Sequence, residues 1–284
     1  MSTATDRPTP ARNSLPRDAW VNFKRWSRKA VRNPTAFFLE IVVGVFSLLL
    51  FSAVFGDVGE FALAQAGYAD VDYLTYLVPA VFMQATMGSA FTSGVGLVGD
   101  LESGMFEKVT ATPMGWTAVL LGKAAADLLR ILVQLLVVLA LAVALGASVE
   151  TGVAGVVGIA AVSLLVGLLF MSVANILGVL VRDEEAINAA SMLFMFPLLF
   201  LSPAFIPVAS DIEWLARLNP VTYGVDAIRA LVLGEDVLTV LEVSRFGGIY
   251  DTLVPAVAVL VGLNVVFGAI AVWVLGRASS VDAA

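Results

Sequence analysis

Six long apolar tracts constrain the fold of this chain more than any other feature of its sequence. Each tract has about 20 residues or more, which is the length that an α-helix needs to cross a ~30 Å hydrocarbon core. The tracts cover residues 36–55, 73–98, 124–146, 153–181, 186–206 and 253–275. The sequence therefore predicts an all-α polytopic membrane protein with six transmembrane helices.

The composition agrees with a membrane protein and excludes several kinds of chemistry. Of the 284 residues, 60% are hydrophobic and 14% are charged, with a mean hydropathy of +0.94, whereas soluble domains are roughly 45–50% apolar. A net charge of -7 offers no basic face for nucleic acid. The chain has no cysteine and no histidine, so thiolate nucleophiles, imidazole bases and their metal sites are excluded. We expect no catalytic residue, no metal and no cofactor on this chain.

Lysine and arginine are distributed unevenly between the two ends of the predicted spans. With the N-terminus in the cytoplasm, only three basic residues lie in the outer loops, and Arg130 lies at the inner end of the third span. The remaining twelve are then on the inner side: Arg7, Arg12, Arg17, Lys24, Arg25, Arg28, Lys29, Arg32, Lys108, Lys123, Arg182 and Arg277. The positive-inside rule therefore predicts a multi-pass protein of the cell membrane with both termini cytoplasmic. The long basic N-terminal region argues against a signal peptide.

The region before the first span predicts a helix that lies on the membrane surface. We expect a disordered basic tail at residues 1–17 and a single six-span domain at residues 34–284. Between them, in residues 18–33, apolar and basic residues each recur at steps of three and four, which places them on different faces of a helix. One face carries Trp20, Phe23, Trp26, Ala30 and Val31, and the other carries Arg17, Lys24, Arg25, Arg28 and Arg32. Aromatic residues opposite cations are typical of a helix in the headgroup plane. A disordered basic segment is the alternative.

The outer loop before the last span also predicts short helices. Residues 203–249 are partly apolar but contain no stretch long enough to span. Asn219 before Pro220 is a typical N-cap followed by proline at N1. The residues on one face of the following helix would be Val221, Val225, Ile228 and Val232. We expect helices that dip into the membrane or lie on its surface.

Polar residues within the spans are candidates for function because they are costly in lipid. The residues are Glu40, Gln84, Gln134, Asn175 and Asn264. Hydrogen bonding between helices is the preferred interpretation for the amides. Glu40 could line a translocation path, reach the cytoplasmic surface or pair with a base. We take Glu40, Gln84 and Asn175 as candidates for the translocation path.

Two further patterns predict helix packing. Asp127 and Arg130 are three residues apart at the inner end of the third span, which predicts a local salt bridge. Gly88, Thr92 and Gly96 form a small-residue stripe on the second span, which predicts close packing within the subunit or across a dimer.

The segment GDLESGMFEKVTATP, residues 99–113, interrupts the apolar sequence between the second and third spans. A helix from Leu101 to Ala111 would place Leu101, Met105 and Val109 on one stripe beside Phe106. A solvated connecting loop is the alternative, but ~25 residues is much longer than the typical 2–8 for such joints. Nearby, Gly122-Lys123 precedes alanine and lacks the glycine spacing of a phosphate-binding loop, so we expect no nucleotide hydrolysis by this chain.

Two motifs resemble the ABC-2 type family of ABC transporter permeases. The first is an E-x-G-x-x-E run, a T-P pair and a Gly-Lys pair, formed by Glu102, Gly104, Glu107, Thr112, Pro113, Gly122 and Lys123. The second precedes the last span and consists of Asn219, Pro220, Tyr223, Asp226 and Arg229. The resemblance covers the chain from about residue 18 to its end.

The resemblance implies the permease subunit of an ATP-driven exporter of small amphiphilic, drug-like or lipid-like molecules. Two separate ABC-type ATP-binding subunits would bind ATP and Mg, and the permease would pair with a second copy or a related permease. A cytoplasmic coupling helix would contact the ATPase through Asp100, Glu102, Gly104, Met105, Phe106, Glu107, Lys108, Thr112 and Pro113. The alternative is an ion-coupled secondary transporter that depends on Glu40. An intramembrane enzyme is disfavoured by the missing histidine and cysteine.

Overall fold

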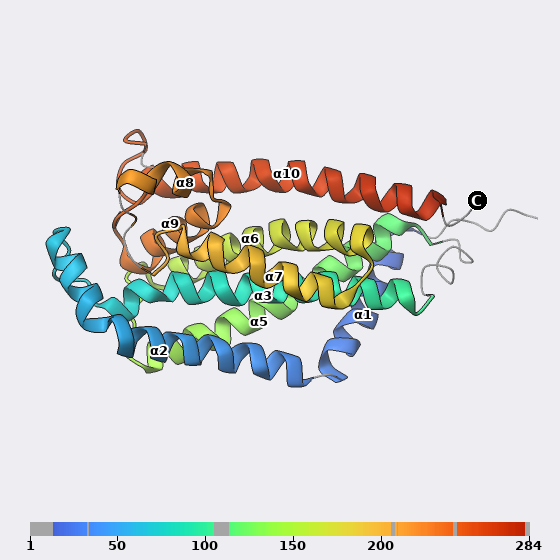
Figure 1. Cartoon of the computed structure of the whole chain (residues 1–284), viewed down its shortest axis with the longest axis horizontal. Helices are drawn as coiled ribbons and strands as arrows, with labels where there is room; N and C mark the ends of the chain where they lie inside the picture. Colours follow the sequence, from blue (N-terminus) through green and yellow to red (C-terminus); the bar gives the residue numbers. More distant parts are fainter. Residues whose placement is uncertain are drawn as a thin grey trace, which may run out of the picture.

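The computed structural model describes residues 14–32, 34–104, 114–205, 208, 210–240 and 243–281, and these ranges form an all-helical bundle (Figure 1). They contain nine α-helices and one 3-10 turn, which confirms the predicted all-α class. The helices are α1 (Leu15–Arg32), α2 (Pro34–Gln65), α3 (Tyr73–Glu102), α5 (Trp116–Ala144), α6 (Gly152–Val181), α7 (Glu184–Phe200), α8 (Glu213–Leu218), α9 (Pro220–Leu233) and α10 (Tyr250–Val281), with the 3-10 turn at Ser210–Ile212 before α8.

Five of the described helices are long and apolar enough to cross a membrane: α2, α3, α5, α6 and α10. The fifth predicted span, residues 186–206, is not among these five; it corresponds to α7, which has 17 residues and is thus about 25 Å long. The predicted end at residue 206 is wrong, because the chain leaves the helix after Phe200 and turns through residues 201–204.

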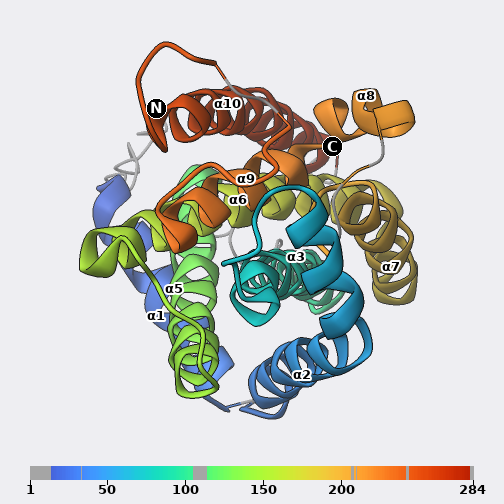
Figure 2. The same cartoon turned by 90° about the vertical axis from the view of Figure 1, so that its left-hand side faces the viewer.

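Helix α3 occupies the centre of the bundle and is buried along most of its length (Figure 2). Helices α2 and α10 lie at the periphery and expose large apolar side chains, among them Phe38, Phe46, Val265 and Trp273. Such faces fit a lipid environment, where an exposed apolar side chain carries no cost.

Helices α3 and α6 pack closely at a glycine that the predicted small-residue stripe omits. A Cβ at Gly94 would lie 2.8 Å from the carbonyl oxygen of Ala174, so any larger residue would separate the two helices. Of the predicted stripe, Gly88 faces open space, whereas Gly96 contacts the ring of Trp26. The expected close packing through Gly88 is therefore wrong within this chain.

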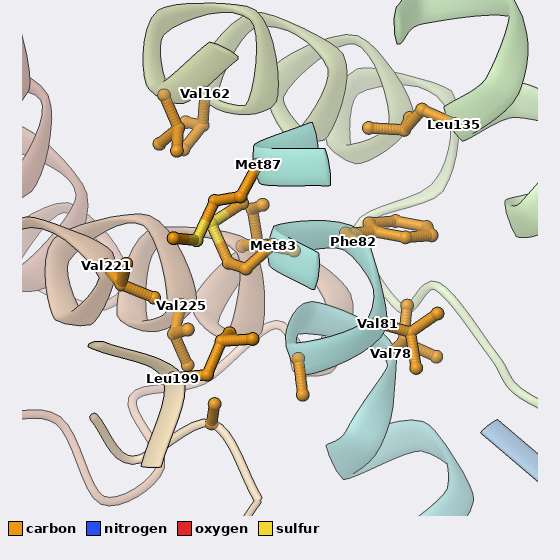
Figure 3. Close-up of a cluster of buried hydrophobic side chains, with 14 of the residues drawn as sticks. Val78, Val81, Phe82, Met83, Met87, Leu135, Val162, Leu199, Val221 and Val225 are labelled. Carbon is orange, nitrogen blue, oxygen red and sulfur yellow. The ribbon is translucent and has the colours of Figure 1, made fainter. Parts of the chain in front are cut away.

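Helix α9 is inserted into the bundle rather than lying on its surface. The predicted N-cap is confirmed, since the Asn219 side chain accepts a hydrogen bond from the Val221 N–H and Pro220 begins the helix. Figure 3 shows Val221 and Val225 of α9 beside Met83 and Met87 of α3. The predicted apolar face is confirmed as buried, together with most of the rest of α9. The surface-lying alternative thus applies only to α8, where Trp214 and Leu218 are exposed.

Helix α1 begins three residues before its predicted start. Its first turn is closed by hydrogen bonds from the N–H groups of Arg17 and Asp18 to the Ser14 carbonyl. Pro16 in the first turn and Asp18 favour a helix start at this point. In Figure 1, α1 and the C-terminal end of α10 lie at one end of the bundle, and α8 and α9 lie at the other.

Candidate functional site

A row of polar side chains follows α3 towards the end of the bundle that carries α1. Ser89, Thr92, Ser93 and Asp100 follow one another at steps of three, one and seven residues, so they share one side of the helix. Each of them contacts a charged side chain from α1, α2 or α5. We call this set and its charged partners the α3 ion network.

The first part of the network joins α2 to α5. Arg130 of α5 forms an ion pair with Glu40 of α2, and Ser89 donates to the second carboxylate oxygen at 2.8 Å. Gln134 lies 2.6 Å from the same hydroxyl. One hydroxyl has one proton, so Ser89 shares it between the Glu40 carboxylate and the Gln134 side-chain oxygen. Gln134 Nε2 is buried and has no partner among the described residues.

The second part of the network is centred on Lys123, which is 2% exposed. Its ammonium donates to the Ser93 carbonyl and to the Asp127 carboxylate, both at 2.7 Å, and also contacts the Ser93 hydroxyl. It lies 4.7 Å from the centroid of the Trp26 ring of α1. Four groups on three helices therefore surround one buried cation, which is the arrangement that makes a buried charge tolerable.

These contacts overturn the predicted local salt bridge between Asp127 and Arg130. Asp127 pairs with Lys123 four residues earlier, and Arg130 pairs with Glu40 on another helix. Of the three predicted roles of Glu40, pairing with a base is the one observed. The charge on which the secondary-transport alternative depends is thus neutralised by a partner.

Gly122, the neighbour of Lys123, allows α1 to approach α5 closely. A Cβ at Gly122 would lie 2.6 Å from the Cβ of Asn22 and closer still to the Ala19 carbonyl oxygen. The Gly-Lys pair therefore has two structural roles. Gly122 allows the α1 backbone to pack closely on α5, and Lys123 interacts with Ser93 and Asp127.

The third part of the network ties the last turn of α3 to α1. Asp100 is 6% exposed and pairs with Arg25 at 2.5 Å and with Lys29 at 3.3 Å. Asp100 is predicted to contact the ATPase, and in the structure its carboxylate contacts α1. Glu102 is exposed at the last position of α3, and Gly104 follows in a turn with a φ of 65°.

The remaining residues of the predicted coupling helix lie outside the described residues: Met105, Phe106, Glu107, Lys108, Thr112 and Pro113. Its predicted start at Leu101 is wrong, because α3 continues through Glu102. A separate helix in this segment can begin only after the turn at Ser103–Gly104.

The face of α1 that contacts the protein differs from the predicted aromatic face. The buried residues are Asp18, Asn22 and Trp26, and of these only Trp26 belongs to the predicted set. Trp20 stacks on Phe23 at 5.2 Å and is 55% exposed, and Arg28 is exposed. The outward aromatic pair is consistent with a helix that contacts lipid headgroups, which stays a prediction.

The intramembrane amides divide into two groups. Gln134 contacts Ser89 of α3, and Asn264 donates to the Leu165 carbonyl of α6 at 2.9 Å, which confirms the predicted bonds between helices. Gln84 and Asn175 are half-buried, and each has a buried side-chain oxygen without a partner in the described ranges. These two residues stay candidates for the translocation path.

The second family motif, which precedes the last span and which we call the outer motif for its predicted position, forms a second buried cluster around Arg229, which is completely buried. Its guanidinium donates to the Pro203 carbonyl at 2.5 Å, lies 3.9 Å from the Tyr76 ring centroid and is 3.9 Å from the Asp226 carboxylate. Asp226 also accepts from the Val240 N–H at 2.9 Å. Burial raises the pKa of the Asp226 carboxyl to about 7, against the opposing effects of Arg229 and of the Val240 N–H.

Three other residues of the outer motif fix the ends of α8 and α9. The Asn219 amide donates to the Leu198 carbonyl of α7 at 2.5 Å, and the Tyr223 hydroxyl donates to the Arg217 carbonyl of α8 at 2.5 Å. Pro220 supplies the first turn of α9. The motif therefore holds the short outer helices against α3 and α7.

The fold and these clusters define a class: a multi-pass helical membrane protein whose buried charges pair with one another. No cluster of three metal-ligating side chains occurs among the residues that the structure describes. The model of the ABC-2 type transporter family matches residues 17–233, from α1 to the last residue of α9. The chain therefore belongs to the ABC-2 type transporter family, and it is a permease subunit without ATPase activity of its own.

A curated relative supports this assignment. The chain is 30% identical over 197 residues to the daunorubicin resistance ABC transporter permease protein DrrB1 of Streptomyces coeruleorubidus. The aligned part covers 68% of this chain and 67% of that protein. Membership in the family implies a separate ATP-binding partner subunit.

Proposed function

We propose that the chain forms the translocation path of an ATP-driven exporter, with six spans and both termini in the cytoplasm. In this arrangement α7 is the fifth span and α10 the sixth, and α1 and the C-terminal end of α10 lie on the inner side. Two ATP-binding subunits carry ATP and Mg, and the second permease is another copy or a related chain. The concentration of basic residues around α1 supports this orientation.

The observation that supports the proposal is that α3, the most central helix of the bundle, is unbroken up to Glu102 and so ends next to the segment 105–113 in the sequence. Asp100, two residues before the end of α3, is bound to α1. A displacement of the segment by a closing ATPase therefore acts on α3 and α1 together. ATP binding would favour one of two arrangements of the spans through such differential contacts.

The proposed substrate is a small amphiphilic molecule, drug-like or lipid-like. The name of the relative connects that protein with daunorubicin resistance. This connection supports the proposed class of substrate. Gln84 of α3 and Asn175 of α6 each supply a buried side-chain oxygen that has no partner among the described residues. A few hydrogen-bonding groups of this kind suit a ligand with few polar groups.

The proposal predicts that the tagged permease co-isolates with a soluble ATPase that has a phosphate-binding loop, and that Glu107→Lys weakens this association at least tenfold. Reversal of a charge at a docking surface replaces attraction with repulsion. The measurement is the ratio of ATPase to permease after purification, with Glu213→Lys on the exposed outer helix α8 as the matched control. An unchanged ratio for Glu107→Lys would remove Glu107 from the interface, and isolation without any ATPase would contradict the proposed function.

A further inference from the structure

One face of α1 carries four cations around a hollow. Arg25, Arg28, Lys29 and Arg32 follow one another at steps of three, one and three residues, so their side chains gather on one side of the helix. They line a hollow of ≈ 520 Å³. Two of the four cations, Arg25 and Lys29, also belong to the α3 ion network through Asp100, whereas Arg28 and Arg32 do not.

The charges of the hollow are not balanced. Arg25 and Lys29 share the single carboxylate of Asp100. Arg28 and Arg32 make no ion pair within the part of the chain that the structure describes, and both are exposed. Four cations with one anion leave an excess of three positive charges. The hollow therefore favours an anionic ligand with several acceptor oxygens.

A phosphate group has the chemistry that matches these donors. Guanidinium groups bind phosphate oxygens through paired N–H donors, and three of the four cations are arginines. The position of the hollow favours a lipid phosphate over a soluble one. Arg32 ends α1, and α2 begins two residues later at Pro34. The first turns of α2 expose Phe38, Leu39 and Val42, which are 63%, 61% and 59% exposed and would contact acyl chains.

We propose that Arg25, Arg28, Lys29 and Arg32 form a binding site for the phosphate headgroup of an anionic phospholipid. The lipid places its acyl chains along the exposed apolar face of α2. Its phosphate interacts with the same two cations that hold Asp100, so lipid binding acts on the last turn of α3. The site depends on neither the ATPase nor the transported substrate.

The test is native mass spectrometry of the purified full chain with equal amounts of phosphatidylglycerol and phosphatidylcholine at low ionic strength. We expect preferential retention of phosphatidylglycerol by the unchanged protein. Arg28→Gln with Arg32→Gln should lower its affinity on the order of 30-fold, since each basic residue near an anionic headgroup contributes roughly fivefold. Retention of phosphatidylcholine should not change. Arg28→Lys with Arg32→Lys should restore most of the affinity, and Arg217→Gln at the outer end should have no effect.

Three results would overturn the proposal. The first is equal retention of the two lipids by the unchanged protein. The second is unchanged phosphatidylglycerol affinity in the Arg28→Gln, Arg32→Gln variant. The third is complete displacement of phosphatidylglycerol by an equal concentration of inorganic phosphate, which would assign the hollow to free phosphate. Displacement only by a large excess of inorganic phosphate supports a lipid site.

Discussion

Replacement of Lys123 by methionine should lower the free energy of unfolding by about 3–5 kcal/mol. Methionine has nearly the same length as lysine but leaves the Asp127 carboxylate without its cation and the Ser93 carbonyl without its donor. A buried charge that loses its partner costs more than the pair contributes. The expected loss of stability is therefore large, although the change preserves much of the side-chain volume.

Thermal unfolding of the detergent-purified protein, followed by size-exclusion chromatography, measures this effect. Lys24→Met on the exposed face of α1 is the matched control and should change stability by less than about 0.5 kcal/mol. Lys123→Met combined with Asp127→Asn should recover part of the loss, because the uncompensated charge is then removed. A single variant as stable as the control would show that Lys123 does not hold α1, α3 and α5 together.

Replacement of Arg229 by methionine should also lower the free energy of unfolding by about 3–5 kcal/mol. The change removes the donor to the Pro203 carbonyl, the cation above the Tyr76 ring and the charge next to Asp226. Arg217→Met is the control: Arg217 forms an exposed pair with Glu213, and such pairs contribute about 0–1 kcal/mol.

The Arg229→Met variant should also acquire a stronger pH dependence than the unchanged protein. Burial already raises the pKa of Asp226 to about 7, and loss of the Arg229 charge raises it further. An acid whose pKa is higher in the folded state loses stability as the pH rises through that folded pKa. The difference in stability between variant and unchanged protein should therefore increase from about pH 6 to about pH 8. Equal differences at both pH values would show that Asp226 does not titrate in this range.

The positions of the helices followed from simple features of the sequence. Apolar tracts of spanning length located the long helices, and the pair Asn219–Pro220 located the start of α9. The ends of helices do not follow from hydropathy where a helix continues into polar residues. The last turn of α3 contains Asp100 and Glu102, so the apolar tract ends at residue 98 although the helix continues to Glu102.

The partners of the buried charges did not follow from sequence spacing. Asp127 and Arg130 are close along α5, but each has a better partner at a different position. Which residue lies opposite Arg130 depends on how α2 and α5 are aligned, and no local pattern records that alignment.

The protein-facing side of α1 did not follow from the sequence either. The pattern of residues 18–33 predicts a helix in the headgroup plane, with lipid as the partner of its aromatic face, and does not indicate which side packs on the protein. The side that packs on α5 then contains Asp18, Asn22 and Trp26, where the small Gly122 admits the α1 backbone.

The central claim is that this permease moves its substrate only when a separate ATPase drives it. The most direct test is efflux of an amphiphilic fluorescent dye from liposomes that contain the chain with or without its co-isolated ATPase. We predict efflux that requires the ATPase, ATP and Mg, and that does not respond to proton or sodium gradients. Gradient-driven efflux by the chain alone would contradict the account.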